Sequence, residues 1–193
     1  MVGRGIAICV LGIALVLGLA CAQTEEATEQ REGPATDSSP VAATTPAGRA
    51  TPQGPQRIVT AGPGAVAEAE GVRVTLNEIR DPFQSRNQFA QAPQGRRFVA
   101  FDVTIERTRG GSHYAYCGNF KLQSQDGFVA DYDLSAMVAV GTENLPTLSG
   151  SNIGSGEKVR GWCAFAVGAD ARLAVLKYDP SLVTTNDIEF RFQ

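Results

Sequence analysis

The sequence has few of the side chains on which catalytic and metal sites depend. It contains one histidine, one tryptophan and four cysteines in 193 residues. A single imidazole excludes sites that need two or three histidines. A Ser–His–Asp triad would have to use His113, and the Gly-x-Ser-x-Gly elbow of many hydrolases is missing from the sequence. We therefore expect a protein that is not an enzyme and that carries no cofactor.

The chain also lacks an excess of positive charge and a long apolar run. Its 17 basic and 20 acidic side chains give a formal net charge of −3. Nucleic-acid-binding domains are usually basic with a clustered patch, so we expect no nucleic-acid partner. The longest apolar run, residues 5–20, is shorter than the about 20 residues that a transmembrane helix needs.

Residues 1–20 have the composition of a secretory signal peptide. Arg4 precedes the apolar run, which ends at the small residue Ala20. Residues 17–21, Leu-Gly-Leu-Ala-Cys, resemble the lipobox of bacterial lipoproteins. The resemblance implies cleavage before Cys21, acylation of Cys21, and an exported protein held by this lipid on the outside of a bacterial membrane. A plain secretory signal, or an uncleaved anchor, is the alternative.

Residues 21–56 are predicted to form a disordered linker. After Cys21 this segment has no aromatic residue, one large aliphatic residue (Val41) and five of the ten prolines. Such a composition cannot bury enough apolar surface to offset the chain entropy lost on folding. Residues 57–193 hold all nine Phe, all four Tyr and the only Trp. We therefore expect one folded domain, 57–193, tethered to a lipid anchor.

The folded segment shows the period-two alternation typical of β-strands. Large apolar residues alternate with smaller or polar ones in five runs: 72–76, 99–105, 128–134, 159–167 and 188–192. Turn signals separate the runs at Asp81-Pro82, Gly110-Gly111, Asp126-Gly127, 154–156 and Asp179-Pro180. The pattern predicts an all-β antiparallel sandwich of about seven to nine strands, a hairpin over 120–130, and short helical turns at 133–138 or 180–185.

Several of these runs also carry a family resemblance. Residues 97–106 read Arg-Phe-Val-Ala-Phe-Asp-Val-Thr-Ile-Glu, residues 156–162 read Gly-Glu-Lys-Val-Arg-Gly-Trp, and residues 176–178 read Leu-Lys-Tyr. Together with Gln-Asp-Gly at 125–127 they resemble the bacterial envelope family called domain of unknown function 4352, over about residues 70–180. The resemblance implies an immunoglobulin-like (telokin-like) sandwich in a lipoprotein or secreted protein, and it implies no reaction.

Two cysteines remain for the folded domain. Cys9 lies in the signal peptide and Cys21 at the lipidation site, which leaves Cys117 and Cys163. Two such thiols in an exported protein usually pair, so we expect a Cys117–Cys163 disulfide. By the chain-entropy relation, closing that loop contributes about 4 kcal/mol to stability. Free core thiols and a metal site are the alternatives.

Trp162 is the most conspicuous candidate for partner binding. It faces away from Cys163 on an alternating strand, beside Arg160, and Tyr114 and Tyr116 lie in a predicted turn. Aromatic residues with an Arg neighbour have the composition of a binding hot spot. The alternative is that a long loop, 139–156 for instance, folds over Trp162 and hides it, and we favour this arrangement.

The remaining polar candidates give weaker signals. Asp126, Asp131 and Asp133 are weak candidates for a Ca²⁺ site, because three nearby carboxylates can hold this ion. Acidic outer faces of strands are common, so we predict no metal. His113 follows two glycines and a serine, and we expect its imidazole to be exposed in a turn.

These observations predict a non-catalytic envelope lipoprotein whose β-sandwich is a binding or interaction module for an unknown envelope protein or small ligand. The alternatives are a small-ligand or Ca²⁺-binding accessory protein of an envelope transport system, and a weak hydrolase. A carrier needs a concave apolar pocket with a few polar groups. An interaction module needs a flat exposed patch, expected around Trp162, and an enzyme needs perturbed titratable groups in a cleft.

Overall fold

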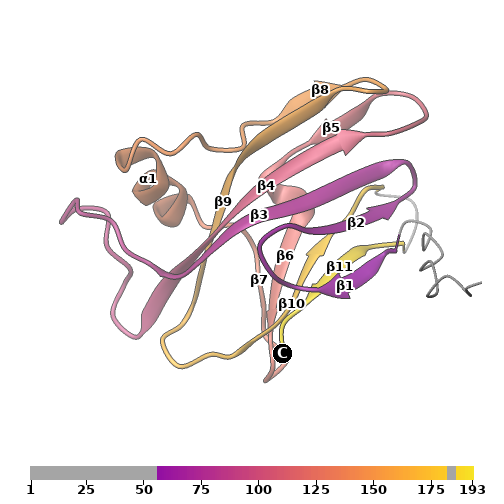
Figure 1. Cartoon of the computed structure of the whole chain (residues 1–193). Coiled ribbons are helices and arrows are strands. Elements are labelled where there is room, and N and C mark those ends of the chain that lie inside the picture. Colours follow the sequence, from indigo (N-terminus) through magenta and orange to yellow (C-terminus); the bar gives the residue numbers. More distant parts are fainter. Residues whose placement is uncertain (1–55, 182–185) are drawn as a thin grey trace, which may run out of the picture. The chain divides into compact units, whose positions relative to one another are not determined.

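The computed structural model describes residues 56–181 and 186–193. The predicted signal peptide 1–20, the lipidation site Cys21 and all but the last residue of the linker 21–56 lie outside the described residues. Most of the predicted helical turn at 180–185 also lies outside them. Four of the five alternating runs form strands over most or all of their length, as Figure 1 shows. The run 128–134 forms a strand only at Val129–Ala130, because the helix that Asp133 caps begins at Leu134.

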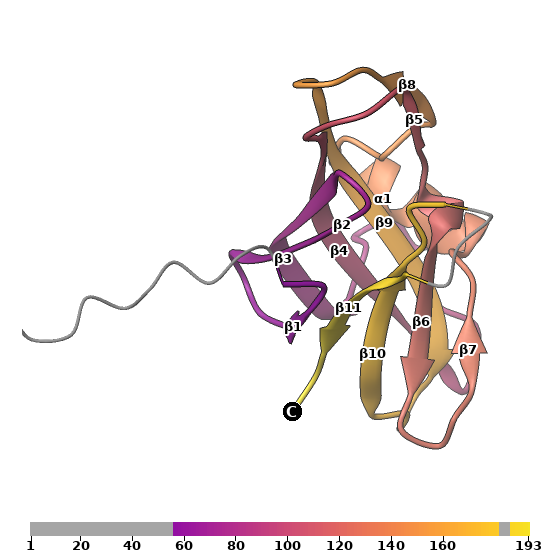
Figure 2. The ribbon, with the colours of Figure 1, turned by 90° about the vertical axis from the view of Figure 1, so that its right-hand side faces the viewer.

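Nine strands form two main sheets, and one further pair stands apart. The five-stranded sheet has the order β1 (Ile58–Thr60), β11 (Ile188–Arg191), β10 (Leu173–Tyr178), β6 (Phe120–Ser124), β7 (Val129–Ala130). The four-stranded sheet has the order β2 (Ala65–Ala69), β3 (Val72–Phe83), β4 (Arg96–Arg107), β9 (Lys158–Gly168). The short strands β5 (His113–Ala115) and β8 (Ser151–Ile153) pair with each other. Figure 2 shows the five-stranded sheet in front of the four-stranded sheet.

The predicted β-sandwich is therefore confirmed, with two differences in detail. β1 pairs in parallel with β11, whereas the other strand pairs of the two sheets are antiparallel. The Asp81-Pro82 signal marks no turn, because β3 continues through it to Phe83. β2 pairs only with residues 72–76 of β3, so Pro82 lies where β3 is an edge strand on one side, and the register with β4 shifts there. A proline without an N–H is tolerated at such an edge or bulge.

The core lies between the two sheets and follows the alternation of the strands. Phe101 and Phe165 from the four-stranded sheet meet the inner residues Leu122, Leu176 and Phe190 of the five-stranded sheet. All five side chains are essentially inaccessible to solvent. Burial of this apolar face is the main favourable term for folding, because apolar surface leaves water.

A second apolar cluster covers the opposite face of β4 and β9. Trp162, Ala164 and Ala166 on β9 lie with Phe98 and Ala100 in this cluster. The covering element is the helix α1 (Leu134–Thr142), which contributes Ala136, Ala139 and Val140. Because most of the outward residues are alanines, the helix can approach the sheet closely. β4 and β9 are consequently buried on both faces over much of their length.

The helix α1 extends the predicted helical turn at 133–138. Asp133 caps its N-terminus, since the Asp133 side chain accepts a hydrogen bond from the Ala136 N–H at 2.9 Å. The helix has nine residues. Across the described ranges, no helix has both the length and the apolar character needed to cross a bilayer.

Candidate functional site

Trp162 lies beneath the loop that follows α1. Its side chain is only 4% exposed. The backbone N–H of Trp162 donates to the carbonyl of Pro146 at 2.8 Å, and the backbone N–H of Leu148 donates to the Trp162 carbonyl at 3.0 Å. The favoured arrangement, in which part of 139–156 covers the indole, is confirmed. The prediction of a flat exposed patch around Trp162 is wrong, because Ala139, Val140 and Leu145 pack in the same apolar cluster as the indole.

Two charged side chains flank Trp162 on the outer face of the sheet. The Arg80 guanidinium lies 4.6 Å from the centroid of the Trp162 ring. Arg160 donates to both oxygens of Asp102 from across β4 and β9, with Nε at 3.2 and 3.0 Å and Nη2 at 2.5 Å. The hydrogen bond to Asp102, which is itself buried, raises the pKa of Arg160 above its ordinary value. Arg160 therefore neutralises a buried carboxylate, although most of its own side chain is exposed.

Tyr114 and Tyr116 belong to a separate aromatic group near β5. The Tyr114 and Tyr116 ring centroids lie 6.0 Å apart, and those of Tyr116 and Tyr132 lie 5.5 Å apart. The Tyr116 and Tyr132 hydroxyls share a hydrogen bond, which raises the pKa of Tyr116. Tyr114 is exposed and Trp162 is buried, so the four candidate residues do not form one accessible patch. A role of the tyrosines in binding stays a prediction.

Cys117 and Cys163 are joined by a disulfide within the core. Cys117 begins the short 3₁₀ turn η1 (Cys117–Asn119), and Cys163 lies on the inner face of β9. Their Cα atoms are 5.6 Å apart, and the bond joins positions 46 residues apart in the chain. The disulfide thus ties the segment that follows β5 to the strand that carries Trp162.

The three carboxylates considered for Ca²⁺ have separate partners. Asp131 pairs with the Lys121 ammonium, Asp133 caps α1, and Asp126 accepts a hydrogen bond from the Ser124 hydroxyl. The described part of the chain contains no cluster of three or more His, Cys, Asp or Glu residues arranged to hold a metal ion. The structure does not bring the three together, because a turn, a strand end and a helix cap each orient one of them.

His113 was expected to be exposed, and the structure shows the opposite. It lies on β5, is 7% exposed, and its Nε2 shares a hydrogen bond of 2.5 Å with the Tyr178 hydroxyl. Burial, assisted by the positive charge of Arg107, lowers the pKa of His113. Burial also raises the pKa of Tyr178. The expectation was wrong because pairing of β5 with β8 draws His113 inward, a contact that no local pattern reveals.

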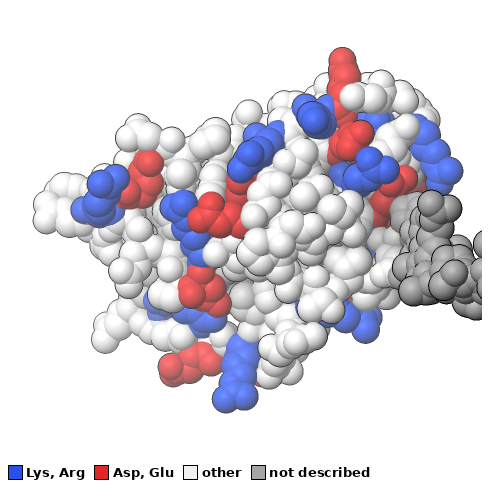
Figure 3. Space-filling model, in the orientation of Figure 1, with Lys and Arg blue, Asp and Glu red and all other residues white. Residues whose placement is uncertain are grey.

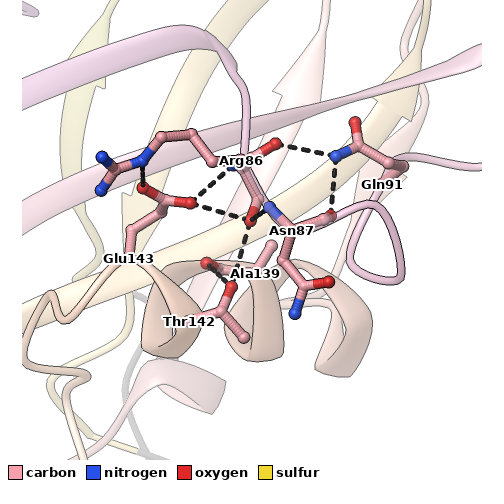
Figure 4. A network of polar contacts seen from close by, with 7 residues as sticks. Arg86, Asn87, Gln91, Ala139, Thr142 and Glu143 are labelled. Carbon is pink, nitrogen blue, oxygen red and sulfur yellow. Dashed lines mark hydrogen bonds and ion pairs between the residues drawn. The ribbon is translucent and has the colours of Figure 1, made fainter.

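The loop between β3 and β4, residues 84–95, was not singled out from the sequence, and we call it the braced loop. Figure 4 shows how Glu143, just after α1, holds this loop. One Glu143 oxygen accepts from the Arg86 N–H at 2.6 Å and from the Ser85 hydroxyl at 3.0 Å, while the other accepts from Arg86 Nε at 2.8 Å. The bonds from Arg86 lower the pKa of Glu143. Gln91 closes the loop by donating to the carbonyls of Ser85 and Asn87.

The braced loop presents one aromatic side chain to solvent. Phe89 is 89% exposed, although its N–H is held by Asn87 Oδ1 at 2.9 Å and the next residue, Ala90, is buried. Leu134 and Val138 of α1 are also exposed. They precede Thr142 on the same stripe of the helix, with a spacing of four residues. The Thr142 and Ser85 hydroxyls share a hydrogen bond, so the end of this stripe contacts the braced loop.

A cavity of about 360 Å³ opens where the edges of the two sheets separate. β7 and β9 are the edge strands on this side (Figure 2). Tyr132, which follows β7, forms a backbone bridge with Phe165 of β9, and residues on both sides of the sandwich line the cavity. The lining is mostly apolar, and it includes Arg96 and Asp126. Neither the braced loop nor the cavity corresponds to a periodic pattern in the sequence. Arg96 and Asp126 are the only residues of the cavity lining that could have pointed to it from the sequence.

The charged side chains show no field of one sign on the face drawn in Figure 3. Blue basic and red acidic groups alternate across it. Several of them are paired along the outer face of the four-stranded sheet, including Arg73 with Glu68 and Glu106. This face therefore has no basic patch of the kind that surfaces binding polyanions show.

The comparisons with known proteins place this geometry among bacterial β-sandwiches. Residues 62–188 match the profile of the family described as Domain of unknown function (DUF4352). The crystal structure of the predicted lipoprotein YcdA from Bacillus subtilis has a TM-score of 0.50 and 15% identity, over 68% of this chain and 38% of that chain. At this identity the likeness shows the fold alone, and the match spans well under half the length of YcdA.

Two further solved structures are similar at lower scores. The YjhA protein from Bacillus subtilis has a TM-score of 0.49 and 18% identity, over 68% of this chain and 96% of that chain. The secreted protein MPT63 from Mycobacterium tuberculosis has a TM-score of 0.48 and 14% identity, over 69% of this chain and 96% of that chain. A comparison with curated protein sequences gives no match.

Proposed function

The chain belongs to the DUF4352 family of domains of unknown function, and from this premise we propose that it is a non-catalytic envelope lipoprotein whose β-sandwich docks another envelope protein around Phe89. The lipobox-like residues 17–21 support anchoring by a lipid on Cys21. The Cys117–Cys163 disulfide suits an oxidising compartment outside the cytoplasm.

The braced presentation of Phe89 is the observation that carries the proposal. An apolar ring in water is unfavourable, yet hydrogen bonds from Arg86, Phe89 and Gln91 hold the backbone of the loop in the conformation that exposes Phe89. A partner that binds a prearranged loop loses less conformational entropy than one that must order it. A rigid aromatic anchor is the usual centre of a protein–protein hot spot.

Charge favours a protein partner over a polyanion or an anionic membrane. The Arg86 side chain beside Phe89 is 87% exposed, but Glu143 already pairs with it. The exposed stripe of Leu134 and Val138 adds apolar surface on α1. Aromatic and Arg side chains with adjoining apolar surface are enriched at protein interfaces, where isolated charges are depleted.

Small-ligand binding is the second candidate function, and the cavity between β7 and β9 favours it. Its volume of about 360 Å³ falls at the lower end of ligand pockets, which span roughly 300–1,000 Å³. Its apolar lining with a few polar groups is the composition expected of a carrier. Docking at Phe89 and binding in the cavity use different residues, so they can be tested separately.

Site-specific photo-crosslinking in intact cells tests the docking proposal. A photoreactive phenylalanine analogue replaces Phe89 in the full-length protein, and the same analogue at Val66, an exposed residue of β2, is the control. We expect one discrete adduct from position 89 and none of that mass from position 66. The captured protein is then identified, purified and titrated against wild type, Phe89→Ala and Val66→Ala.

Loss of a hot-spot aromatic weakens binding by about thirtyfold or more. We therefore expect this loss for Phe89→Ala and unchanged affinity for Val66→Ala. The same adduct from both positions, no adduct from position 89, or full affinity of the Phe89→Ala variant would each overturn the proposal.

A further inference from the structure

The cavity near the edge strands β7 and β9 has two opposite charges in a mostly apolar lining. Its apolar lining comes from both sheets: Leu122, Phe128, Val129, Ala130, Ala166 and Val167. Arg96 comes from the start of β4, and Asp126 from the turn between β6 and β7. The two are not paired with each other: each has a different partner.

Each charged group is oriented by a contact of its own. The Arg96 Nη2 donates to the carbonyl of Ala166 at 2.5 Å, and its Nε and Nη1 have no partner among the described residues. The Ser124 hydroxyl donates to Asp126 Oδ1 and to the Phe128 carbonyl. By contrast, the neighbouring Arg97 is fully engaged with Asp81 and three carbonyls. Arg96 therefore keeps donors for a ligand, and Asp126 keeps a carboxylate oxygen.

We propose that this cavity binds a small zwitterion with an apolar side chain, of the class of the apolar α-amino acids. The ligand carboxylate pairs with Arg96, the ammonium pairs with Asp126, and the side chain packs on Leu122, Ala130 and Val167. The inference rests on the second candidate function and gives it a ligand class. It does not depend on docking at Phe89.

The charge pattern selects this class over simpler apolar ligands. A hydrocarbon would offer no partner to Nε and Nη1 of Arg96 or to the second carboxylate oxygen of Asp126, both of which are exposed residues of the lining. A fatty acid would bring its carboxylate to Arg96 but would also lie against Asp126, and an alkylamine would meet the reverse problem at Arg96. A zwitterion can form charge-assisted hydrogen bonds with both groups at once, which neither a hydrocarbon nor a singly charged ligand can do. A cavity of about 360 Å³ suits a ligand of a few to a dozen heavy atoms rather than a whole lipid.

The test compares three ligands that share the phenylalanine side chain and differ in which charged groups they carry. Phenylalanine carries both charges, N-acetylphenylalanine lacks the ammonium, and phenylalanine amide lacks the carboxylate. Each is titrated by calorimetry into the full-length protein held in lipid nanodiscs, which avoids detergent in the cavity. We expect phenylalanine to bind at least tenfold more tightly than either blocked analogue.

Variants assign each charge to its partner. Arg96→Gln should reduce the affinity for phenylalanine to that for the amide, and Asp126→Asn should reduce it to that for the N-acetyl compound. Arg172→Gln is the matched control, since Arg172 lies outside the cavity lining, and it should leave all three affinities unchanged. Ala171→Phe, which fills the cavity from its rim, should abolish binding of all three ligands.

The outcomes separate the ligand class from the function. Equal binding of the three compounds, or loss of affinity in Arg172→Gln as large as in Arg96→Gln, overturns the zwitterion proposal. If a neutral apolar dye binds in a manner blocked by Ala171→Phe while phenylalanine does not bind, the ligand class is wrong and the small-ligand function stands. If neither the dye nor phenylalanine binds, both are wrong.

Discussion

Glu143 accepts hydrogen bonds from both the backbone N–H and the guanidinium of Arg86, a residue 57 positions earlier in the chain. The pair joins the end of α1 to the loop between β3 and β4 (Figure 4). Glu143 thereby adds to the contacts that already join these two elements, the Ser85–Thr142 hydrogen bond and the packing of Ala90 in the cluster under α1. The display of Phe89 depends on this coupling.

Replacing Glu143 by Ala should loosen the braced loop without unfolding the sandwich. The Arg86 N–H and the Ser85 hydroxyl lose their acceptor, so amides in 84–91 should exchange hydrogen about tenfold faster, because local opening becomes easier. Hydrogen exchange followed by mass spectrometry measures this. Glu157→Ala is the control, since Glu157 caps the separate turn at Gly154. Unchanged exchange in 84–91 would show that Glu143 does not brace the loop.

Replacing Trp162 by Ala should destabilise the domain far more than replacing Phe89. The indole is buried in the apolar cluster that α1 covers, and truncating such a side chain costs about 3 to 5 kcal/mol. Phe89→Ala removes an exposed ring and should change stability by at most about 0.5 kcal/mol. Urea unfolding of the wild type and both variants measures these changes in the free energy of unfolding. Similar losses for the two would contradict the burial of Trp162.

The Cys117–Cys163 disulfide should contribute about 4 kcal/mol to the free energy of unfolding, because it restricts a long loop of the unfolded chain. The Cys117→Ser/Cys163→Ser double variant and the reduced wild type should therefore unfold at similar, lower urea concentrations. The oxidised wild type should resist alkylation until it is reduced. Two thiols that alkylate freely before reduction would be incompatible with this bond.

Stability should fall on acidification because of His113. Burial lowers its pKa in the folded protein below the ordinary 6.5. As the pH falls through about 6.5 the unfolded chain takes up a proton that the folded chain does not, so the free energy of unfolding decreases until folded His113 is also protonated. His113→Gln should reduce this decrease between about pH 7.5 and 5. Tyr178→Phe, which keeps the buried imidazole, should retain it. If the free energy of unfolding of His113→Gln falls as steeply with pH as that of the wild type, groups other than His113 cause the decrease.

The fold was accessible from the sequence, because strand patterns are local. Residues 99–105 alternate without interruption, and the structure buries Phe101 and Val103 in the core between the sheets. The hairpin at 120–130 was also predicted, because the Asp126-Gly127 turn separates two apolar runs. The Asp81-Pro82 signal failed, because the local preference for a turn does not include the pairing with β4 that continues β3.

The candidate site was less accessible, because it depends on contacts between distant segments. Trp162 and Cys163 were assigned to opposite faces of one strand, which the structure bears out. What covers Trp162 depends on where α1 and the 146–148 segment return to β9. Phe89 lies in a polar stretch with no periodicity, so its exposure follows from Glu143 and from the burial of Ala90.

Local chemistry was therefore enough to predict most of the strands and their apolar faces, since each depends on neighbouring residues alone. The signal-like start and the change of composition near residue 57 also come from neighbouring residues, and they stay predictions. Tertiary structure decided which outward residues stay in water. His113 and Trp162 became buried through partners far along the chain, whereas Phe89 stayed exposed because its loop is held from α1. The cavity is lined by residues of both sheets, so it depends on how strands far apart in the sequence are placed, which no single segment determines.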